Sequence, residues 1–212
     1  MTPGHADLLL VVDVQVDFMA GGALPVPDGD AVVAPINALQ TKFGQVALTQ
    51  DWHPPGHVSF AAHHPGRAPF ERVRLPYGDQ TLWPSHCVRG TPGAAFAPGL
   101  DTGFADLVVR KGTHFTVDSY SAFLEADRTT RTGLAGALRE RGVTRLTLCG
   151  LATDFCVLWS ALDARDAGFA VVVVEDAVRG IDAPSPAGGS VAEAWARMAA
   201  AGVHRVRMAE ID

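Results

Sequence analysis

Short apolar segments alternate along this chain with segments whose apolar residues recur at helical spacing. The apolar segments cover residues 8–14, 45–49, 106–110, 145–149, 169–174 and 203–208. Helical spacing falls on residues 29–43, 129–141, 156–168 and 190–201. Continuous apolar runs of strand length are typical of parallel strands that are covered on both faces. The alternation therefore predicts an α/β fold with a mostly parallel sheet of roughly six strands and helices on both faces.

Length and composition favour one globular domain. A chain of 212 residues is long enough for one substantial core and short for two, so we expect residues 1–212 to form a single domain. Residues 51–103 are rich in proline, glycine and aromatic residues but are not of low complexity. Loop regions this long in a compact domain tend to carry function, so we expect this one to contribute to a site.

Charge and cysteine content narrow the classes of partner. The formal net charge is −6 and the basic residues do not cluster, so we expect no nucleic-acid or membrane partner. The longest apolar runs are too short to span a bilayer, and the first residues lack the pattern of a secretory signal. Three cysteines, Cys87, Cys149 and Cys156, form no spaced disulfide framework. We therefore expect a reducing, cytoplasmic setting.

Four polar features fall at or just after the ends of predicted strands. Asp13 ends the first strand, Asp51 follows the second, Lys111 follows the third, and the turn before Cys156 follows the fourth. In open α/β sheets, ligands bind outside the carboxyl ends of the strands, where the strand order reverses. We therefore expect these distant residues to meet in one crevice.

The stretch LCGLATDFCVLW at residues 148–159 predicts a strand, a turn and a helix that carries Cys156. Thr153 or Asp154 suits the N-cap of this helix. A thiol near a helix N-terminus is favoured as the thiolate, and the free N–H groups there can hold an oxyanion. The alternative is that Cys156 is a small, inert core residue, as most free cysteines are.

Asp13 and Lys111 are candidates to assist such a thiol. A buried aspartate with a raised pKa can take the proton of a cysteine nucleophile and return it to a leaving amine. A nearby lysine favours both the carboxylate and the thiolate. The alternatives are a structural ion pair for Asp13 and a solvated strand-end position for Lys111.

The string Asp51-Trp52-His53 places two potential metal ligands on one side of an extended segment. A third histidine from the same long loop could complete the site, and spacing does not choose between His86, His57, His63 and His64. Aspartate and histidine suit zinc, iron or manganese. The alternative is that these are solvated loop histidines.

Five strings taken together resemble one family of enzymes. They are DVQVDF, QDWHP, WPSHCVRGTPGA, RKG with DSYSAF, and GLATDFCV, and they occur in this order between about residues 8 and 180. They are similar to those of the nicotinamidase family, which belongs to the isochorismatase-like cysteine hydrolases. The resemblance implies a three-layer α/β/α sandwich, in agreement with the expected sheet.

The resemblance also implies roles for individual residues. The catalytic set would be Asp13, Lys111 and Cys156, and the metal ligands Asp51, His53 and His86, with His57 as a candidate fourth ligand or supporting residue. The peptide between Leu151 and Ala152 would be cis, and the N–H groups of Ala152 and Cys156 would form the oxyanion hole. Phe18 and Trp83 would sandwich a pyridine ring, with Tyr120 near the pocket.

The implied activity is hydrolysis of nicotinamide to nicotinate and ammonia through a Cys156 thioester, in NAD salvage, with pyrazinamide as a second substrate. One divalent metal would assist, zinc before iron or manganese, in a monomer or small homo-oligomer. The first alternative is a related amidase for a carbamoyl or ureido substrate. The others are a metallohydrolase in which metal-bound water attacks, and a binding protein without turnover.

Overall fold

A six-stranded parallel sheet forms the centre of the molecule. The computed structural model describes residues 1–185 and 188–212. The strands are β1 (Asp7–Val12), β2 (Val46–Asp51), β5 (Leu107–Lys111), β6 (Arg145–Leu151), β7 (Ala170–Arg179) and β8 (His204–Val206). Their order is β5-β2-β1-β6-β7-β8, and every neighbouring pair is parallel. The predicted parallel sheet is confirmed.

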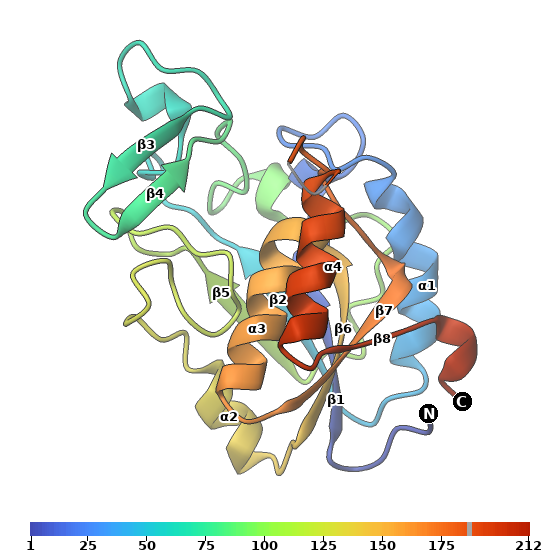
Figure 1. The fold of residues 1–212 in the computed structure, drawn as a ribbon. Helices are drawn as coiled ribbons and strands as arrows, with labels where there is room; N and C mark the ends of the chain where they lie inside the picture. Colours follow the sequence, from blue (N-terminus) through green and yellow to red (C-terminus); the bar gives the residue numbers. More distant parts are fainter. Residues whose placement is uncertain (186–187) are drawn as a thin grey trace.

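Helices cover both faces of this sheet (Figure 1). They are α1 (Val33–Gln40), α2 (Leu134–Glu140), α3 (Leu158–Asp166) and α4 (Ser190–Ala200). Buried residues of α2, α3 and α4 form one apolar cluster with alternate residues of the central strands, such as Leu8 and Leu10. Leu9 and Val11 point the other way, into a second cluster with α1. The three-layer α/β/α sandwich is therefore confirmed.

Two predicted helices are shorter in the structure than in the sequence pattern. The segment predicted over 29–43 divides into a 3₁₀ turn, Gly29–Val32, followed by α1. The helix predicted over 129–141 begins only at Leu134. Asp127 accepts hydrogen bonds from the backbone N–H groups of Thr129 and Thr130, and Gly133 has a φ of 92°. A turn closed by an aspartate side chain competes with a helix, so the first predicted turn is lost.

The long loop region between β2 and β5 contains a hairpin that the sequence did not predict. Its strands are β3 (Arg72–Leu75) and β4 (Gly78–Thr81), which pair antiparallel. Single bridges join the rest of the region to itself and to the segment after β1, among them His53 with Val88 and Phe60 with Trp83. The hairpin projects from the upper left of the molecule in Figure 1.

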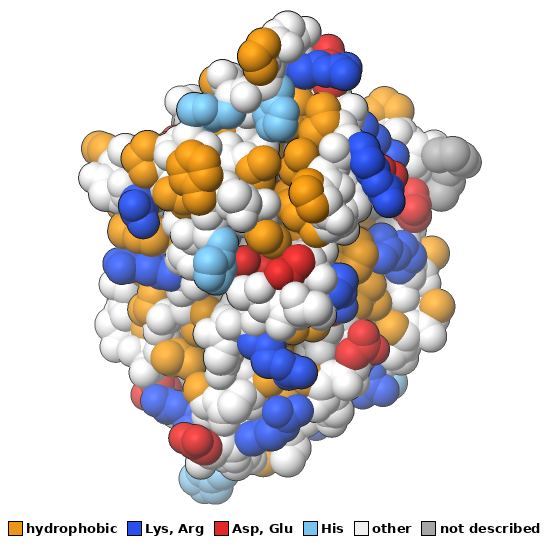
Figure 2. Space-filling model, turned by 90° about the vertical axis from the view of Figure 1, so that its left-hand side faces the viewer, with side chains coloured by type: hydrophobic (Ala, Val, Ile, Leu, Met, Phe, Trp, Pro, Cys, Tyr) orange, Lys and Arg blue, Asp and Glu red, His pale blue; other side chains and the backbone are white. Residues whose placement is uncertain are grey.

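The strand order reverses between β1 and β6. The strands β2 and β5 extend the sheet on one side of β1, and β6, β7 and β8 extend it on the other. The carboxyl ends of these strands lie at the upper end of the molecule, which also carries the hairpin. Figure 2 shows hydrophobic and histidine side chains gathered at this end, above a lower half in which acidic and basic side chains are interspersed. None of the described helices has the length and apolar character needed to cross a bilayer.

Candidate active site

Lys111 lies at the centre of a buried polar cluster at the carboxyl ends of β1, β2 and β5. Its side chain is inaccessible to solvent, and its Nζ lies 2.8 Å from Asp13 Oδ2 and 3.3 Å from Cys156 Sγ. The same ammonium group pairs with Asp51 and donates to the carbonyl of Ser119 at 3.1 Å. The structure therefore brings the three predicted catalytic residues into contact and joins them to a predicted metal ligand.

The two oxygens of Asp13 have different partners. Oδ1 accepts a hydrogen bond from the hydroxyl of Thr49 at 2.6 Å, and the Asp13 N–H donates to the same hydroxyl at 3.1 Å. Apart from its ion pair with Lys111, Oδ2 accepts no hydrogen bond from the described residues. Asp13 follows the last residue of β1 with a φ of 48°, so the chain turns there and the carboxylate remains at the sheet edge. Oδ2 is the oxygen available to receive a proton from Cys156.

Burial controls the protonation of this cluster. Burial raises the pKa of Cys156 well above the usual value for a thiol, against the lowering effect of the Lys111 charge. Burial also raises the pKa of Asp13, again against Lys111. The predicted resting thiolate is therefore wrong: this environment stabilises the thiol. The carboxylate of an acid with a raised pKa is the stronger base, so Asp13 suits acceptance of the thiol proton during attack.

Asp51, His53 and His86 form a second cluster beside the first. Asp51 Oδ2 lies 3.7 Å from His53 Nε2 and 3.8 Å from His86 Nε2, and all three residues are buried. Their potential ligand atoms lie within 4.8 Å of one another. Three ligand atoms of these types at this separation can hold a divalent ion and leave other positions open.

Backbone carbonyls orient both histidine rings of this cluster. His53 Nδ1 lies 3.0 Å from the Gly112 carbonyl, and His86 Nδ1 lies 2.8 Å from the Pro84 carbonyl. A carbonyl can only accept, so Nδ1 carries a proton in each ring, and Nε2 is the ring nitrogen left for a metal ion. This is the arrangement that metal-binding histidines adopt.

His57 lies beside the three-residue cluster and has hydrogen-bonding partners of its own. Its Nδ1 lies 2.7 Å from Ser59 Oγ and its Nε2 lies 3.0 Å from the Val117 carbonyl, so both ring nitrogens have protein partners. The ring stacks on His53 with centroids 4.2 Å apart. Burial lowers the pKa of His57 to about 4, so the ring is neutral at pH 7. His57 therefore supports the His53 ring, and its potential ligand atom also lies within 4.8 Å of those of His53 and Asp118. A role as fourth ligand stays a prediction.

A small pocket opens onto both clusters. It is lined by Phe18, Leu24, Asp51, His53, Trp83, His86, Asp118, Tyr120, Ala152, Phe155, Cys156 and Ile181. The Phe18 ring lies 5.6 Å from that of His86, on the metal side. Trp83 meets Phe155 edge to face at 5.0 Å and donates its indole N–H to the Tyr120 hydroxyl at 3.1 Å. The aromatic walls therefore come from segments far apart in the sequence.

The turn before Cys156 combines a cis peptide with an unusual first helical turn. The peptide between Leu151 and Ala152 is cis, as the resemblance implied. Residues Thr153–Val157 form a π turn that leads into α3. No side chain caps this turn, so the predicted N-cap is wrong. The Asp154 carboxylate instead accepts hydrogen bonds from the backbone N–H groups of Ile181 and Asp182, which attaches the segment after β7 to the site.

Three residues near the site had no predicted role. Gln15 holds the end of β2, since its amide donates to the Asp51 carbonyl and accepts from the Asp51 N–H, both at 2.8 Å. Phe155 and Asp118 line the pocket. All three lie inside the strings DVQVDF, GLATDFCV and DSYSAF. Their position within these strings was the only sequence evidence for a role at the site. A single glutamine, aspartate or phenylalanine outside such a string would not have indicated one.

The fold and the site together define a class of protein: α/β/α sandwiches with a buried cysteine, aspartate and lysine beside a potential metal centre, at the point where strand order reverses. A family model for the isochorismatase domain matches residues 7–210. The chain therefore belongs to the isochorismatase family, and within it to the nicotinamidases. A nicotinamidase of Acinetobacter baylyi is 52% identical over 198 residues, which are 93% of this chain and 91% of that protein.

Solved structures agree with this assignment. A nicotinamidase and pyrazinamidase of Acinetobacter baumannii has a TM-score of 0.94 and 51% identity, over 98% of each chain. A pyrazinamidase of Pyrococcus horikoshii in complex with zinc has a TM-score of 0.76 and 37% identity, over 95% of this chain and 99% of that one.

Proposed function

We propose that this protein hydrolyses nicotinamide to nicotinate and ammonia, with Cys156 as the nucleophile. The observation that carries the proposal is the contact of Lys111 Nζ with both Cys156 Sγ and Asp13 Oδ2 at the floor of an aromatic pocket. A thiol with a proton acceptor and a charged group at its side is the arrangement needed for covalent attack on an amide. The activities named for the relatives support the same substrate.

The reaction divides into two steps. Asp13 takes the thiol proton while Sγ attacks the carboxamide carbon, and the backbone N–H groups of Ala152 and Cys156 hold the oxyanion. The carbon–nitrogen bond then breaks, Asp13 returns the proton to the leaving ammonia, and water hydrolyses the thioester to nicotinate. Phe18 and Trp83 hold the pyridine ring so that the carbonyl carbon faces Sγ. One oxyanion donor is worth roughly a hundredfold or more in rate.

The chemistry of the donor set fits one divalent metal ion. Asp51, His53 and His86 supply one oxygen and two nitrogens, and both imidazoles have their other nitrogen committed to a carbonyl. We propose zinc, because a pyrazinamidase of this fold holds zinc; iron and manganese accept the same donors. When bound, the metal supplies positive charge that polarises and orients the pyridine substrate. The nucleophile remains the thiol of Cys156.

The substrate assignment is tested by comparing amides. We expect the purified, zinc-loaded protein to release ammonia from nicotinamide and from pyrazinamide, since both present a carboxamide on a flat ring that fits between aromatic walls. A carbamoyl or ureido compound without a ring should be hydrolysed far more slowly. Preferential turnover of the ureido compound would replace nicotinamide as the substrate and leave the cysteine mechanism in place.

We further propose a role in NAD salvage within the cytoplasm, as a monomer or small homo-oligomer. Support comes from the three buried cysteines, which are all unpaired and so compatible with a reducing compartment.

A further inference from the structure

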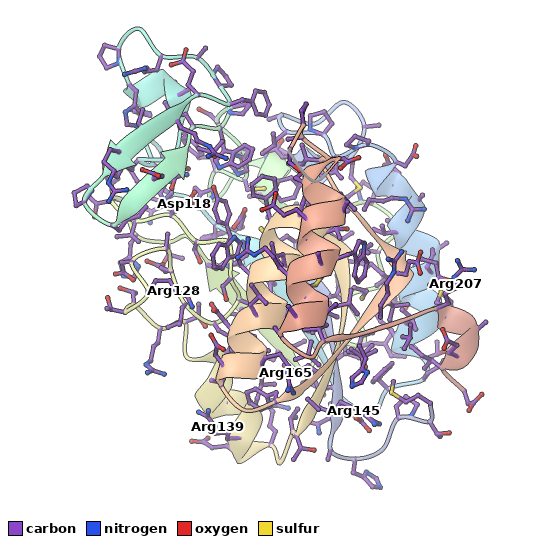
Figure 3. All side chains as sticks on the ribbon, in the orientation of Figure 1. Asp118, Arg128, Arg139, Arg145, Arg165 and Arg207 are labelled. Atoms are coloured by element: carbon purple, nitrogen blue, oxygen red, sulfur yellow. The ribbon has the colours of Figure 1, made fainter. Side chains whose placement is uncertain are left out.

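Asp118 is a buried acidic residue beside the metal-binding cluster. It lies in the segment after β5, below the hairpin (Figure 3), and its side chain is 2% exposed and lines the pocket. One of its carboxylate oxygens lies within 4.8 Å of ring nitrogens of His53 and His57. Asp118 is therefore close to a metal ligand without belonging to the set formed by Asp51, His53 and His86.

Neutral groups alone hold this carboxylate. Oδ1 accepts from the Ser119 N–H at 2.8 Å, and Oδ2 accepts from Gln80 Nε2 at 2.6 Å. No lysine, arginine or histidine of residues 1–185 and 188–212 forms an ion pair with Asp118. A buried carboxylate without an ion-pair partner is costly, so a cation bound beside it would stabilise it.

Gln80 fixes the position of Asp118 from the hairpin. It is the one buried residue of β4, at 1% exposed. Besides Asp118, its amide donates to the Thr81 carbonyl at 2.6 Å, and its carbonyl accepts from the Tyr77 hydroxyl at 2.9 Å. The hairpin thus contacts the site through a polar residue whose amide faces the Asp118 carboxylate.

The balance of charge around the pocket points to a cation near Asp118. Asp51 and Asp118 line the pocket, and the buried ammonium group beside Asp51 is that of Lys111. Lys111 pairs with Asp13 and Asp51. The charge of Asp118 therefore remains without an ion-pair partner, beside His53 and His57.

We propose that Asp118 is a positioning residue of the metal centre: its negative charge, held in place by Gln80, increases the affinity of the Asp51, His53 and His86 set for a divalent cation. The inference rests on the metal site of the proposed function. It assigns Asp118 no direct role in the chemical steps. Groups that orient a metal's ligands typically change its affinity by about 10- to 100-fold when they are mutated, and we expect an effect of this order from the charge of Asp118.

The test is the zinc affinity of the full-length protein, measured by competition with a chromogenic chelator. Asp118→Asn and Asp118→Ser both remove the charge, and we expect each to weaken zinc binding by about 10- to 100-fold. Asp118→Glu keeps the charge and should restore a substantial part of the affinity. Asp79→Asn is the matched control, because it neutralises an exposed carboxylate of β4 that pairs with Arg74; its zinc affinity should equal that of the parent.

A second readout separates this role from a structural one. The thermal midpoint of the metal-free variants should fall much less than their metal affinity, whereas a packing role would lower both. Unchanged zinc affinity in either neutral variant, or a Glu variant as weak as the Asn variant, would overturn the proposal. Failure of the parent to bind zinc would instead remove the metal centre itself, and so count against the proposed function.

Discussion

At the scale of single residues, the burial of Lys111 separates a catalytic role from the ordinary role of a lysine at a strand end. A lysine at a strand end is ordinarily solvated, yet this one is 1% exposed and touches two carboxylates and the thiol. Burial lowers the pKa of Lys111, but the charges of Asp13 and Asp51 outweigh it and raise the pKa well above its usual value. Lys111 therefore stays charged and joins the nucleophile to the metal ligand.

The pKa of His57 predicts a loss of stability in acid. Because burial lowers this pKa from 6.5 to about 4, the unfolded chain binds a proton at a pH where the folded protein does not. The contribution of His57 to the free energy of unfolding is fully present above about pH 6.5 and is lost as the pH falls toward 4. We expect metal-free protein to lose up to roughly 3 kcal/mol of unfolding free energy over this range through His57.

Urea unfolding of the metal-free protein at several pH values checks this. His57→Gln cannot titrate, so its unfolding free energy should fall less steeply between pH 7 and pH 4 than that of the parent. Parallel curves for the two proteins would show that His57 is not the group responsible.

The principal polar residues of the site could be predicted from the sequence, and their geometry could not. We could predict Asp13, Asp51 and Lys111 as site residues because each ends or follows an apolar strand. His57 could not be decided by spacing, since its Nε2 partner is the carbonyl of Val117, a residue from a distant segment. The roles of Asp118 and Gln80 could not be predicted for the same reason. They depend on a contact between the β3–β4 hairpin and the loop after β5.

At the scale of elements, apolar strands were predicted well and polar ones were missed. The central strands β1 and β6 are nearly continuous runs of buried residues, and such runs can be recognised from the sequence alone. In contrast, β3 alternates between exposed and half-buried positions and has no apolar run. Helix ends were mislocated where side chains bond to the backbone, as at Asp127. Such local competition is not expressed in hydrophobic periodicity.

The end of β5 is where a small backbone change should damage the metal centre. Gly112 has a φ of 62°, and a Cβ added there would lie 2.4 Å from His53 Cε1. Its carbonyl also orients the same ring. We therefore expect Gly112→Ala to displace His53 and weaken zinc binding by about tenfold or more, measured by chelator competition.

Gly66→Ala is the control for this change. Gly66 has a similar φ of 75°, but nothing lies within 4 Å of an added Cβ. It should cost about 1 kcal/mol of stability from the left-handed backbone and leave zinc affinity unchanged. Equal losses of zinc affinity in the two variants would assign the effect to backbone strain and not to His53.

At the scale of the whole molecule, the parallel topology assembles the site. Asp13 and Cys156 follow β1 and β6, the two strands between which the order reverses, while Asp51 and Lys111 end β2 and β5. The rule that ligands bind at this edge let the sequence place these residues together. The strand order itself could not be read from the chain, because apolar runs such as those of β1 and β6 do not identify their neighbours.

We propose that residues 1–212 unfold as one domain, because both apolar clusters share the central sheet. Calorimetry should give one transition with and without metal. Zinc at about 100 times its dissociation constant should add about 2.7 kcal/mol to the unfolding free energy, and a chelator should remove this gain. Two separate transitions, only one of which responds to zinc, would divide the chain into independent units.

In the proposed mechanism the Cys156 thiol, and not a metal-bound water, attacks the amide. The measurement is ammonia release from nicotinamide by zinc-loaded Cys156→Ala beside the parent, with zinc content and thermal midpoint determined for both. We predict turnover by the parent and a loss of at least about a thousandfold in the variant, because no covalent route remains. Turnover near the parental rate in a folded, zinc-loaded Cys156→Ala protein would contradict the mechanism and assign the attack to the metal centre.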